Sequence, residues 1–415
     1  MRHVIMGGSI AGISAAGAIR SNDAAAEIIL LSPERVKPYY RPMIASIIEK
    51  DDADITLSDD PREKYRIRTL TEKAVDLDVR SKEVTLSSGR RQAYDKLLIA
   101  TGRTPVIPET IAGLRGSDVY TLRTLDDARA IQAAAKRAKN AVVLGGGIVG
   151  IKAAVALTRR GLAVTLIEKH SRILSGKLDQ QGSAFITGLL KRENIDVVTN
   201  QQEYEVLRTA GTLQSIRLAP GRIINADFII VALESKPNID AFKTSGISMN
   251  KGILVRETLE TNVPDVYAAG DVVEYRDLIS NSMAVSALWE NAKEMGRVAG
   301  MNMAGSQVRY EGFLENRYIT DILDVPVATL GLVDPEDSTC EMFIASDVSF
   351  YRKTVFKNDV MVGALFINNS EDTGVYSYLI RNRIPLGKLK DLAVRGTLGE
   401  SRYLKPRTFP FSRFQ

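Results

Sequence analysis

The chain has 415 residues, of which 45% are hydrophobic and 25% charged, so we expect an ordinary globular protein of two or three domains. A single cysteine, Cys340, excludes a disulfide within the chain and every paired-cysteine redox motif, and the two histidines, His3 and His170, argue against a histidine metal cluster or a histidine-based catalytic triad. The net charge of +5 is mild and no Lys/Arg run is long, so we expect no nucleic-acid partner.

Two apolar segments, residues 4–19 and 141–158, have to be distinguished from an export signal or a membrane span. Each is interrupted by a cluster of glycines, and the second also contains Lys152. We therefore interpret both as strand–turn–helix segments. The sequence accordingly predicts no membrane span and a cytoplasmic protein.

The segment from His3 to Glu34 has the pattern of a βαβ unit that binds a dinucleotide. An apolar run ends in glycines, and the Ala-rich stretch from about Ile10 to Arg20 predicts a helix. A second apolar run then ends at an acidic residue. This order predicts a nucleotide at the point where the first strand meets the helix.

Each residue of this glycine motif has an expected role. Gly7 permits the tight turn, Ser9 and Ile10 direct backbone N–H groups at a pyrophosphate, and Gly12 lets the helix approach the strand. Glu34 is expected to bind an adenosine ribose. Ser9 replaces the second glycine of the G-x-G-x-x-G pattern and is small enough to preserve the close approach.

The chain then passes through an extended loop, Pro38 to Pro42, whose prolines are incompatible with a helix interior. Short strands are predicted at 74–78 and 83–86. The run from Tyr94 to Ile99 predicts a buried strand that stops at Thr101-Gly102. Open α/β sheets bind their ligands at such strand ends.

A second βαβ unit follows a predicted helix at 126–139. The strand at 141–144 leads into Gly145-Gly146-Gly147-Ile148-Val149-Gly150, then a helix, and then a strand that ends at Glu168. Because all parts of the motif are present, it strongly predicts a second dinucleotide site. Glu168 is expected to accept from a ribose 2′-hydroxyl and to repel a 2′-phosphate, which favours NADH over NADPH; the nearby Lys169 and Arg172 weaken this preference.

The remaining elements are predicted with less detail. We expect helices at 178–193, 283–300 and 376–381, and strands at 195–198, 228–232, 261–271 and 361–367. The strand at 261–271 ends in Gly270-Asp271. From Ser306 the pattern changes to alternating strands, and the last fifteen residues, rich in Arg, Pro and Phe, resemble a tail or docking arm.

Several of these motifs together resemble the FAD- and NAD(P)H-dependent pyridine nucleotide oxidoreductases, and especially the NADH:rubredoxin reductase and nitrite-reductase-like branch. They are the two dinucleotide units, A-T-G-R-T-P between them, and D-V-Y-A-A-G-D after them. Tyr40-Arg41-Pro42 is similar to the branch's flavin-contacting Arg-Pro. The segment 288–305 resembles its helix beneath the flavin.

The resemblance implies an α/β protein with two Rossmann-like dinucleotide-binding domains, the glutathione-reductase-like FAD/NAD(P) fold, and a C-terminal α+β interface domain. The implied FAD-binding domain is discontinuous, with residues 1–116 and 238–305. The NAD(P)H-binding domain would comprise 117–237, and the interface domain 306–415.

The resemblance also assigns residues to the two cofactors. Those implied to bind FAD are Gly7, Ser9, Ile10, Ala11, Gly12, Ser32, Glu34, Arg41, Pro42, Val75, Ala100, Thr101, Gly102, Gly270 and Asp271. Those implied to bind NAD are Gly145, Gly147, Ile148, Val149, Gly150 and Glu168.

Two departures from the family pattern are informative. Many relatives that reduce disulfides have a redox cysteine near the flavin, whereas this chain has only Cys340. Relatives of the rubredoxin type often have a lysine after Arg-Pro and a glutamate in the second helix, and Ser46 and Lys152 stand at those places. We hypothesise that Lys152 favours reduced flavin or binds the nicotinamide carboxamide; the alternative is that it points to solvent.

These observations predict a flavoprotein oxidoreductase. Hydride would pass between NADH and FAD, and without a dithiol the electrons would go to a small iron or iron–sulfur carrier or subunit, such as rubredoxin or a ferredoxin, in either direction. Two alternatives remain open: an NADH oxidase that uses O₂, and a non-catalytic flavin-binding subunit or sensor. The C-terminal domain would either form a homodimer or dock the carrier.

Overall fold

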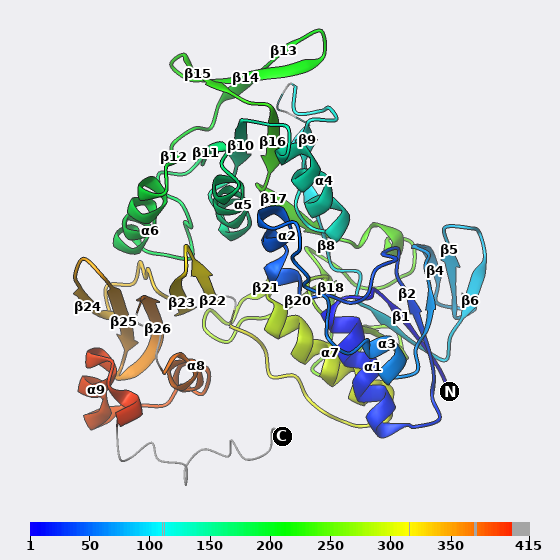
Figure 1. Cartoon of the computed structure of the whole chain (residues 1–415). Coiled ribbons are helices and arrows are strands. Elements are labelled where there is room, and N and C mark those ends of the chain that lie inside the picture. The colour runs from blue at the N-terminus through cyan, green and yellow to red at the C-terminus, as the bar shows by residue number, and fades with distance from the viewer. Residues whose placement is uncertain (110, 112, 315, 369–371, 401–415) are drawn as a thin grey trace. The chain divides into compact units, whose positions relative to one another are not determined.

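The computed structural model describes residues 1–109, 111, 113–314, 316–368 and 372–400, and the expected C-terminal arm lies outside this part of the chain. The chain forms two compact units (Figure 1). The first comprises residues 1–110, 120–137 and 233–315, and the second comprises 111–119, 138–232 and 316–415. Within the described ranges, no helix is long and apolar enough to cross a membrane.

The first unit is built on a parallel five-stranded sheet, in the order β19-β7-β1-β2-β3. These strands are β1 Arg2–Met6, β2 Glu27–Leu31, β3 Arg68–Leu70, β7 Lys96–Ile99 and β19 Val266–Ala268. The central strands are buried almost throughout. Continuous apolar runs of this kind are typical of a parallel sheet covered on both faces.

Two helices from opposite ends of this unit pack on each other, α1 (Ile10–Asn22) and α7 (Trp289–Met303) (Figure 1). A Cβ atom at Gly296 would lie 2.1 Å from the carbonyl oxygen of Ala11, and one at Gly300 would lie 2.4 Å from that of Ala15. Only glycine permits two helix backbones to approach so closely. The small residues of α1 and α7 therefore allow the two helices to pack closely on each other.

The predicted helix at 283–300 begins too early. Met283–Val285 forms strand β21, which pairs antiparallel with β20 (Val273–Arg276), and the helix starts at Trp289. Extended residues that satisfy their backbone groups in a ladder cannot also form the first helical turn. The apolar pattern continues from one element into the other, so the sequence does not mark the boundary between them.

Smaller elements complete the first unit. They are α2 Ala45–Glu49, α3 Pro61–Lys64 and α4 Leu125–Ala135, the antiparallel sheet of β4 Ala74–Asp78, β5 Glu83–Leu86 and β6 Arg91–Ala93, the pair β8 Arg103–Val106 and β17 Glu234–Pro237, and β18 Ile253–Leu254 beside β20. The predicted strands at 74–78 and 83–86 are confirmed. Helices α2 and α4 pack together, and Gln132 of α4 donates to the carbonyl of Lys50 over 3.0 Å.

The second unit contains another five-stranded sheet, in the order β12-β11-β10-β16-β9. Its strands are β9 Val119–Tyr120, β10 Asn140–Leu144, β11 Ala163–Ile167, β12 Ile195–Val198 and β16 Phe228–Val231. Helices α5 (Ile148–Arg159) and α6 (Gln180–Arg192) connect the parallel strands. An antiparallel meander, β13 Tyr204–Thr209, β14 Thr212–Leu218 and β15 Arg222–Asn225, precedes β16.

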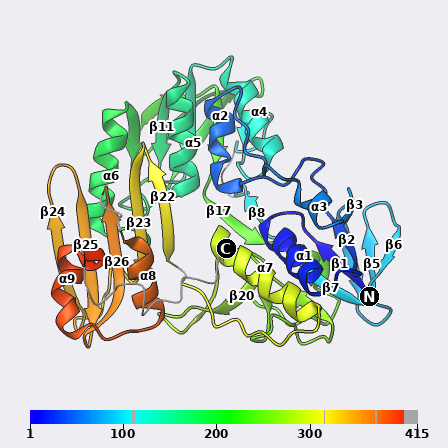
Figure 2. The same ribbon diagram turned by 60° about the horizontal axis from the view of Figure 1, so that its bottom comes forward.

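The same unit ends in an antiparallel sheet, in the order β22-β23-β26-β25-β24 (Figure 2). Its strands are β22 Arg317–Ile322, β23 Val325–Gly331, β24 Glu341–Ser346, β25 Tyr351–Lys357 and β26 Val360–Ile367. Helix α8 (Thr373–Arg381) packs on it through Tyr376, whose ring lies 4.8 Å from that of Phe366. A further helix, α9 (Lys390–Arg395), was not expected from the sequence.

A buried ion pair joins α6 to this C-terminal sheet. The carboxylate of Asp179, which caps α6, accepts from Lys353 Nζ over 2.9 Å and from the Tyr351 hydroxyl over 2.6 Å. The side chains of Asp179 and Lys353 are only 6% and 5% exposed. The sheet that contains β10 and the C-terminal antiparallel sheet of this unit are therefore connected, through α6, by an ion pair as well as by apolar contacts.

Two candidate dinucleotide sites

The first glycine loop has a backbone that only glycines can adopt. Gly7 has a φ of +120°, and a Cβ atom on it would lie 2.1 Å from the carbonyl oxygen of Ala100. A Cβ atom on Gly12 would lie 2.0 Å from the carbonyl oxygen of Gly7. Any larger residue would push the helix and the strand apart. The turn therefore brings the N-terminus of α1 directly to the end of β1.

The N-terminus of α1 has the features of an anion site. Ser9 is its N-cap, yet among the described residues no side chain caps the helix and no acidic residue stands in its first turn. Helices α4 and α6, by contrast, are capped by the side chains of Thr124 and Asp179. Free N–H groups and the positive end of the helix dipole suit a pyrophosphate.

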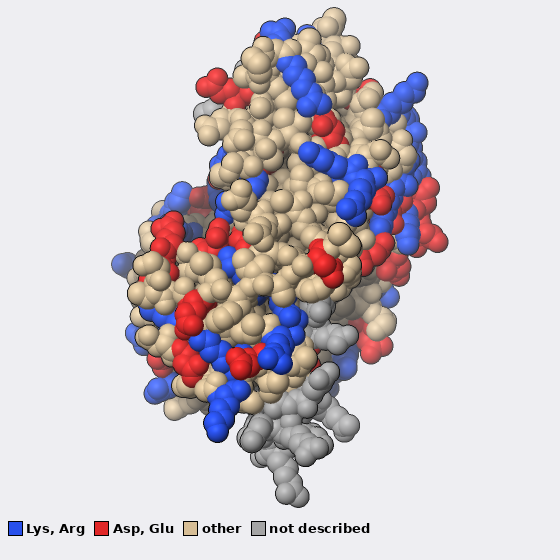
Figure 3. Space-filling view, turned by 90° about the vertical axis from the view of Figure 1, so that its left-hand side faces the viewer, with Lys and Arg blue, Asp and Glu red and all other residues tan. Residues whose placement is uncertain are grey.

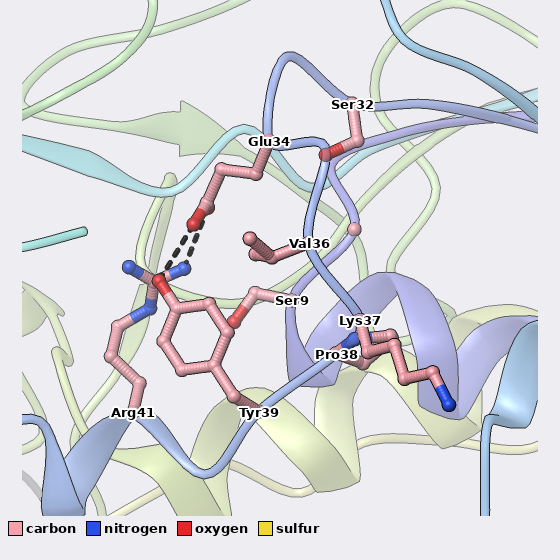
Figure 4. A pocket seen from close by; sticks show the side chains of 9 residues that line it. Ser9, Ser32, Glu34, Val36, Lys37, Pro38, Tyr39 and Arg41 are labelled. Atoms are coloured by element: carbon pink, nitrogen blue, oxygen red, sulfur yellow. Dashed lines mark hydrogen bonds and ion pairs between the residues drawn. The ribbon is translucent and has the colours of Figure 1, made fainter. Parts of the chain in front are cut away.

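A small, open hollow lies beside this loop (Figure 4). It is lined by Gly8, Ser9, Ser32, Glu34, Val36, Lys37, Pro38, Tyr39 and Arg41. The carboxylate of Glu34 accepts from the Tyr39 hydroxyl over 2.6 Å and from Arg41 Nη2 over 2.9 Å. Burial raises the pKa of Tyr39, so its hydroxyl stays protonated and donates to Glu34.

A second arginine, Arg123, lies next to the Arg41 loop and was not predicted as a site residue. Arg123 Nη2 lies 2.9 Å from Asp271 Oδ2, and the Arg123 carbonyl accepts from Arg41 Nη1. A Cβ atom on Gly102 would lie 3.5 Å from Arg123 Nη2. Arg123 thus joins the Gly102 turn, the Gly270-Asp271 turn and the Arg41 loop. In the sequence it lies three residues before the predicted helix at 126–139, and that position alone does not indicate a site residue.

Most residues predicted to bind FAD lie around the first glycine loop, but Val75 and Pro42 lie outside its turns. Val75 is on β4, 44% exposed, in the separate antiparallel sheet. Pro42 lies in a short 3₁₀ helix, Arg41–Met43, with Tyr40 in front of it packing edge-on against Trp289 at a centroid distance of 5.0 Å. The assignment of both residues to the cofactor stays a prediction.

The second glycine loop repeats the first. Gly145 has a φ of +111°, and a Cβ atom on Gly150 would lie 2.0 Å from the Gly145 carbonyl oxygen. Gly147 is the N-cap of α5, and within the described residues this helix also has no side-chain cap. Ile148 and Val149 form its first turn, which contains no acidic residue. The two loops thus offer the same kind of anion site.

Glu168 ends β11 with both carboxylate oxygens already engaged. Oε2 accepts from the Gly146 N–H over 2.6 Å, and Oε1 lies 2.6 Å from His170 Nδ1 and accepts from the His170 N–H over 2.8 Å. His170 was not predicted to take part. Only its position two residues after the acid could have indicated it.

Lys152 lies on α5, four residues beyond its first residue, and is partly buried. Burial lowers the pKa of its ammonium, while the charge of Asp321 on β22 acts in the opposite direction. The side chain is therefore not fully solvated. Whether it acts on a cofactor stays a hypothesis.

The residues of both loops fit the cofactors that the sequence suggests. Each loop offers a glycine cradle, an uncapped helix N-terminus and a carboxylate at the next strand end, which suit the pyrophosphate and ribose of FAD or NAD. These backbone N–H groups and carboxylates suit the binding of two dinucleotides and not of a metal ion. Within the described residues no group of His, Cys, Asp or Glu could hold a metal ion.

Comparison with known proteins gives the same result. The family model for pyridine nucleotide-disulphide oxidoreductases matches residues 1–296. The NADH-dependent phenylglyoxylate dehydrogenase subunit epsilon of Aromatoleum evansii is 30% identical over 421 residues, which cover 98% of each chain.

Rubredoxin-linked relatives are similar over most of their length. The NADH-rubredoxin oxidoreductase of Clostridium acetobutylicum is 32% identical over 311 residues, covering 74% of this chain and 76% of that protein. A crystal structure of NADH:rubredoxin oxidoreductase from the same organism superimposes with a TM-score of 0.76 at 26% identity, covering 95% of this chain and 98% of that one. The predicted glutathione-reductase-like fold is confirmed.

Proposed function

The chain belongs to the pyridine nucleotide-disulphide oxidoreductase family, and on that premise we propose that it passes electrons between NADH and an iron or iron–sulfur protein through bound FAD. Its membership makes it an NAD(P)H-dependent flavin oxidoreductase. The choice of acceptor, the preference for NADH and a cytoplasmic location belong to the proposal.

The observation that carries the proposed acceptor is the position of the only cysteine. Cys340 is buried in the second unit, in the turn before β24, whereas both glycine loops and the Arg41 loop contain no thiol. A flavoprotein without a nearby dithiol has no internal relay for its electrons, so they must go to an external acceptor. The name of the similar Clostridium protein supports rubredoxin as the class of acceptor.

In this proposal the residues of the first unit bind and orient FAD. The α1 N-terminus would hold the pyrophosphate, Glu34 the adenosine ribose, and Arg41, Arg123 and Asp271 the part nearer the flavin. When bound, FAD would supply hydride acceptance and one-electron release. The protein's own contribution is to fix the position of the two cofactors.

In the second unit, Glu168 would select NADH. Its carboxylate is held by Gly146 and His170, so it cannot easily turn away from a nucleotide on the glycine loop. A 2′-phosphate would meet this fixed negative charge. We expect Glu168→Ser to raise the ratio of kcat/KM for NADPH to that for NADH by about ten-fold or more, the effect of roughly 1.4 kcal/mol. An unchanged ratio would remove Glu168 from this role.

A second candidate function has an observation in its favour. The relative that aligns over 98% of both chains is named as a subunit of an NADH-dependent dehydrogenase. The present chain would then be the flavin subunit of a larger enzyme, and it would reduce NAD⁺ with electrons from an iron–sulfur partner. Copurification with such a subunit at fixed stoichiometry would distinguish this function from that of a free carrier reductase.

The decisive experiment is an anaerobic titration of the purified protein with NADH, followed by its visible spectrum. We expect a flavin band that bleaches near one equivalent of NADH, slow reoxidation by air and fast reoxidation by rubredoxin or ferredoxin. Fast reoxidation by air would support an NADH oxidase instead. A colourless protein, or a flavin that NADH leaves oxidised, would support the non-catalytic subunit or sensor.

A further inference from the structure

Two of the three basic residues that closely follow Glu168 are bound by carboxylates. Lys169, His170 and Arg172 come one, two and four residues after this acid. An arginine near the acid is what NADP-dependent sites use to bind the 2′-phosphate. The His170 ring lies on Glu168 itself. Arg172 Nη2 lies instead 2.8 Å from Oδ2 of Asp334, which is 162 positions away in the chain.

The backbone that carries Arg172 is fixed against the second glycine loop. Leu174 donates its N–H to the Gly146 carbonyl over 2.9 Å. The carbonyl of the buried Ile173 accepts from Ser183 Oγ of α6 over 2.8 Å. The Gly146 N–H in turn binds the carboxylate that is expected to bind the ribose. Arg172 therefore starts beside the expected position of the ribose, and its side chain is the part that can turn toward a nucleotide or away from it.

Asp334 is held in place by the C-terminal part of the same unit, three residues after β23. Val333 before it is buried, and Pro335 after it restricts its backbone. The buried pair of Asp179 and Lys353 joins this part of the unit to α6. The carboxylate that binds Arg172 thus has a fixed position relative to the second glycine loop.

We propose that Asp334 is a specificity-determining residue of the second dinucleotide site, because it binds Arg172 and keeps the guanidinium away from the 2′ position of the ribose. The proposal rests on the proposed function, in which this site binds the nicotinamide nucleotide. A 2′-phosphate then meets the fixed charge of Glu168 without the arginine that would offset it. Asp334 thereby restores a preference for NADH that Arg172 alone would weaken.

The ion pair is of a kind that one substitution releases. Its side chains are 31% and 49% exposed, and the contact is made through Nη2 of Arg172. Within the described residues, the buried Nε of Arg172 has no hydrogen-bond acceptor. Exposed pairs of this kind add little to stability, whereas a guanidinium and a phosphate form strong paired hydrogen bonds. Loss of Asp334 should therefore preserve the fold and make Arg172 available to a phosphate.

Glu168 competes only weakly for the released arginine. Both of its carboxylate oxygens already accept hydrogen bonds, from Gly146 and from His170. A 2′-phosphate on the nucleotide would bring oxygens that have no such partners. The released guanidinium is therefore expected to bind the phosphate.

The wider charge distribution does not make this choice. Figure 3 shows the side on which α6 and β24 lie in Figure 1, and acidic and basic side chains are interspersed there. An extended field of one sign would be needed to attract or repel a phosphate from a distance. Single side chains close to the ribose therefore decide between the two nucleotides.

The first test is calorimetric titration of the full-length flavin-loaded protein with NAD⁺ and, separately, with NADP⁺. Asp334→Ala should tighten NADP⁺ binding about five-fold or more and change NAD⁺ binding by less than about two-fold. Asp334→Glu can still bind Arg172 and should resemble wild type. If Asp334→Ala binds NAD⁺ but gains no affinity for NADP⁺, this proposal alone is overturned. A wild-type protein that binds neither nucleotide would overturn the proposed function and this proposal with it.

A second exposed pair controls for the loss of charge. Asp324, in the turn between β22 and β23, lies 2.6 Å from Arg159 of α5. Its φ of +61° is one that asparagine tolerates. Asp324→Asn removes the same charge and should leave the affinity for NADP⁺ unchanged. An equal gain in Asp324→Asn would assign the effect to net charge and contradict the proposal.

A double substitution tests whether Asp334 acts through Arg172. Arg172→Met alone should hardly change NADP⁺ binding, because the guanidinium is already held away from the ribose. In the Arg172→Met background, Asp334→Ala should no longer tighten NADP⁺ binding. A gain that persists without Arg172, or a clear loss of NADP⁺ affinity in Arg172→Met alone, would overturn the proposal.

Discussion

Glu34 and Glu168 both follow the second strand of a βαβ unit, but Glu168 comes directly after β11 whereas Glu34 lies three residues after β2, and their surroundings differ. Glu34 is bound by Tyr39 and Arg41, whereas Glu168 is bound by Gly146 and His170. The sequence predicted an acidic residue after the second strand of each βαβ motif, and its role at a ribose stays a prediction. It could not predict the partners, because these depend on how the following loop folds back.

Lys152 provides a test at the level of one side chain. Burial lowers the pKa of its ammonium, so a substitution that removes this ammonium changes the charge at a partly buried position. If Lys152 acts on the reduced flavin or the nicotinamide, Lys152→Met should slow hydride transfer by about ten-fold or lower the flavin potential. Stopped-flow reduction by NADH and a redox titration would measure both. Lys191→Met, at an exposed position in the last turn of α6, is the control, and unchanged values in Lys152→Met would place the side chain in a structural role.

His3 predicts a loss of stability in acid. The residue is 1% exposed on β1, and burial, together with Lys96 and the N-terminal ammonium, lowers its pKa to about 4. The unfolded chain therefore binds this proton at a higher pH than the native chain does. The stabilising contribution is complete above about pH 6.5 and falls, by up to about 3 kcal/mol, as the pH decreases toward 4.

Urea unfolding between pH 7 and pH 4.5 would measure this loss. His3→Gln cannot titrate, so its stability should depend less on pH than that of wild type over this interval. Parallel curves for the two proteins would show that other groups cause the acid sensitivity.

At the level of elements, local patterns predicted the helices and strands whose periodicity is uninterrupted. The strands at 74–78 and 83–86 and the helix beginning at Ile10 are examples. The error at 283–300 arose where a strand and a helix share one apolar run, because the periodicity of the run does not show that its first residues pair with β20, which lies about ten residues earlier in the chain. Helix α9 is six residues long and contributes only one buried side chain, so it leaves almost no periodic signal.

The ion pair between α6 and the C-terminal sheet should be sensitive to the loss of one partner. Lys353→Met leaves the carboxylate of Asp179 buried with an unpaired charge, so we expect it to reduce the free energy of unfolding by about 3–5 kcal/mol. Adding Asp179→Asn removes the charge but can retain the helix cap, and should restore more than half of the loss. Denaturant unfolding would measure both.

An exposed pair provides the control. Lys357 and Asp337 lie 2.7 Å apart, but both side chains are at least 40% exposed. Lys357→Met should therefore change the free energy of unfolding far less than Lys353→Met does. If this variant lost as much stability as Lys353→Met, burial would not explain the effect.

At the level of the whole molecule, the chemistry should proceed without the only thiol. Cys340→Ser is expected to retain reduction by NADH and transfer to the carrier within about two-fold, because Cys340 lies in the C-terminal part of the second unit and outside both glycine loops. Alkylation of the native protein should have as little effect. A large loss of transfer in the serine variant, with flavin content unchanged, would implicate a thiol in the reaction.

The fold and the positions of the two glycine loops could be inferred from the sequence, since each glycine motif specifies a strand, a turn and a helix in order. The contacts between segments that lie far apart in the sequence could not be inferred in this way. Arg123 is an ordinary arginine in the sequence, and it becomes part of the first site only through its contact with Asp271, far along the chain. The predicted boundaries of the domains stay a prediction.

The contact of α1 with α7 has a consequence for synthesis of the protein. The backbone of α1 is covered only when Gly296 and Gly300 have been made, and the edge strand β19 of the same sheet also comes from this late segment. A ribosome adds about 5–20 residues per second. The nascent first unit therefore remains incomplete for many seconds after its glycine loop has emerged, and the face of α1 that α7 covers stays exposed during this interval.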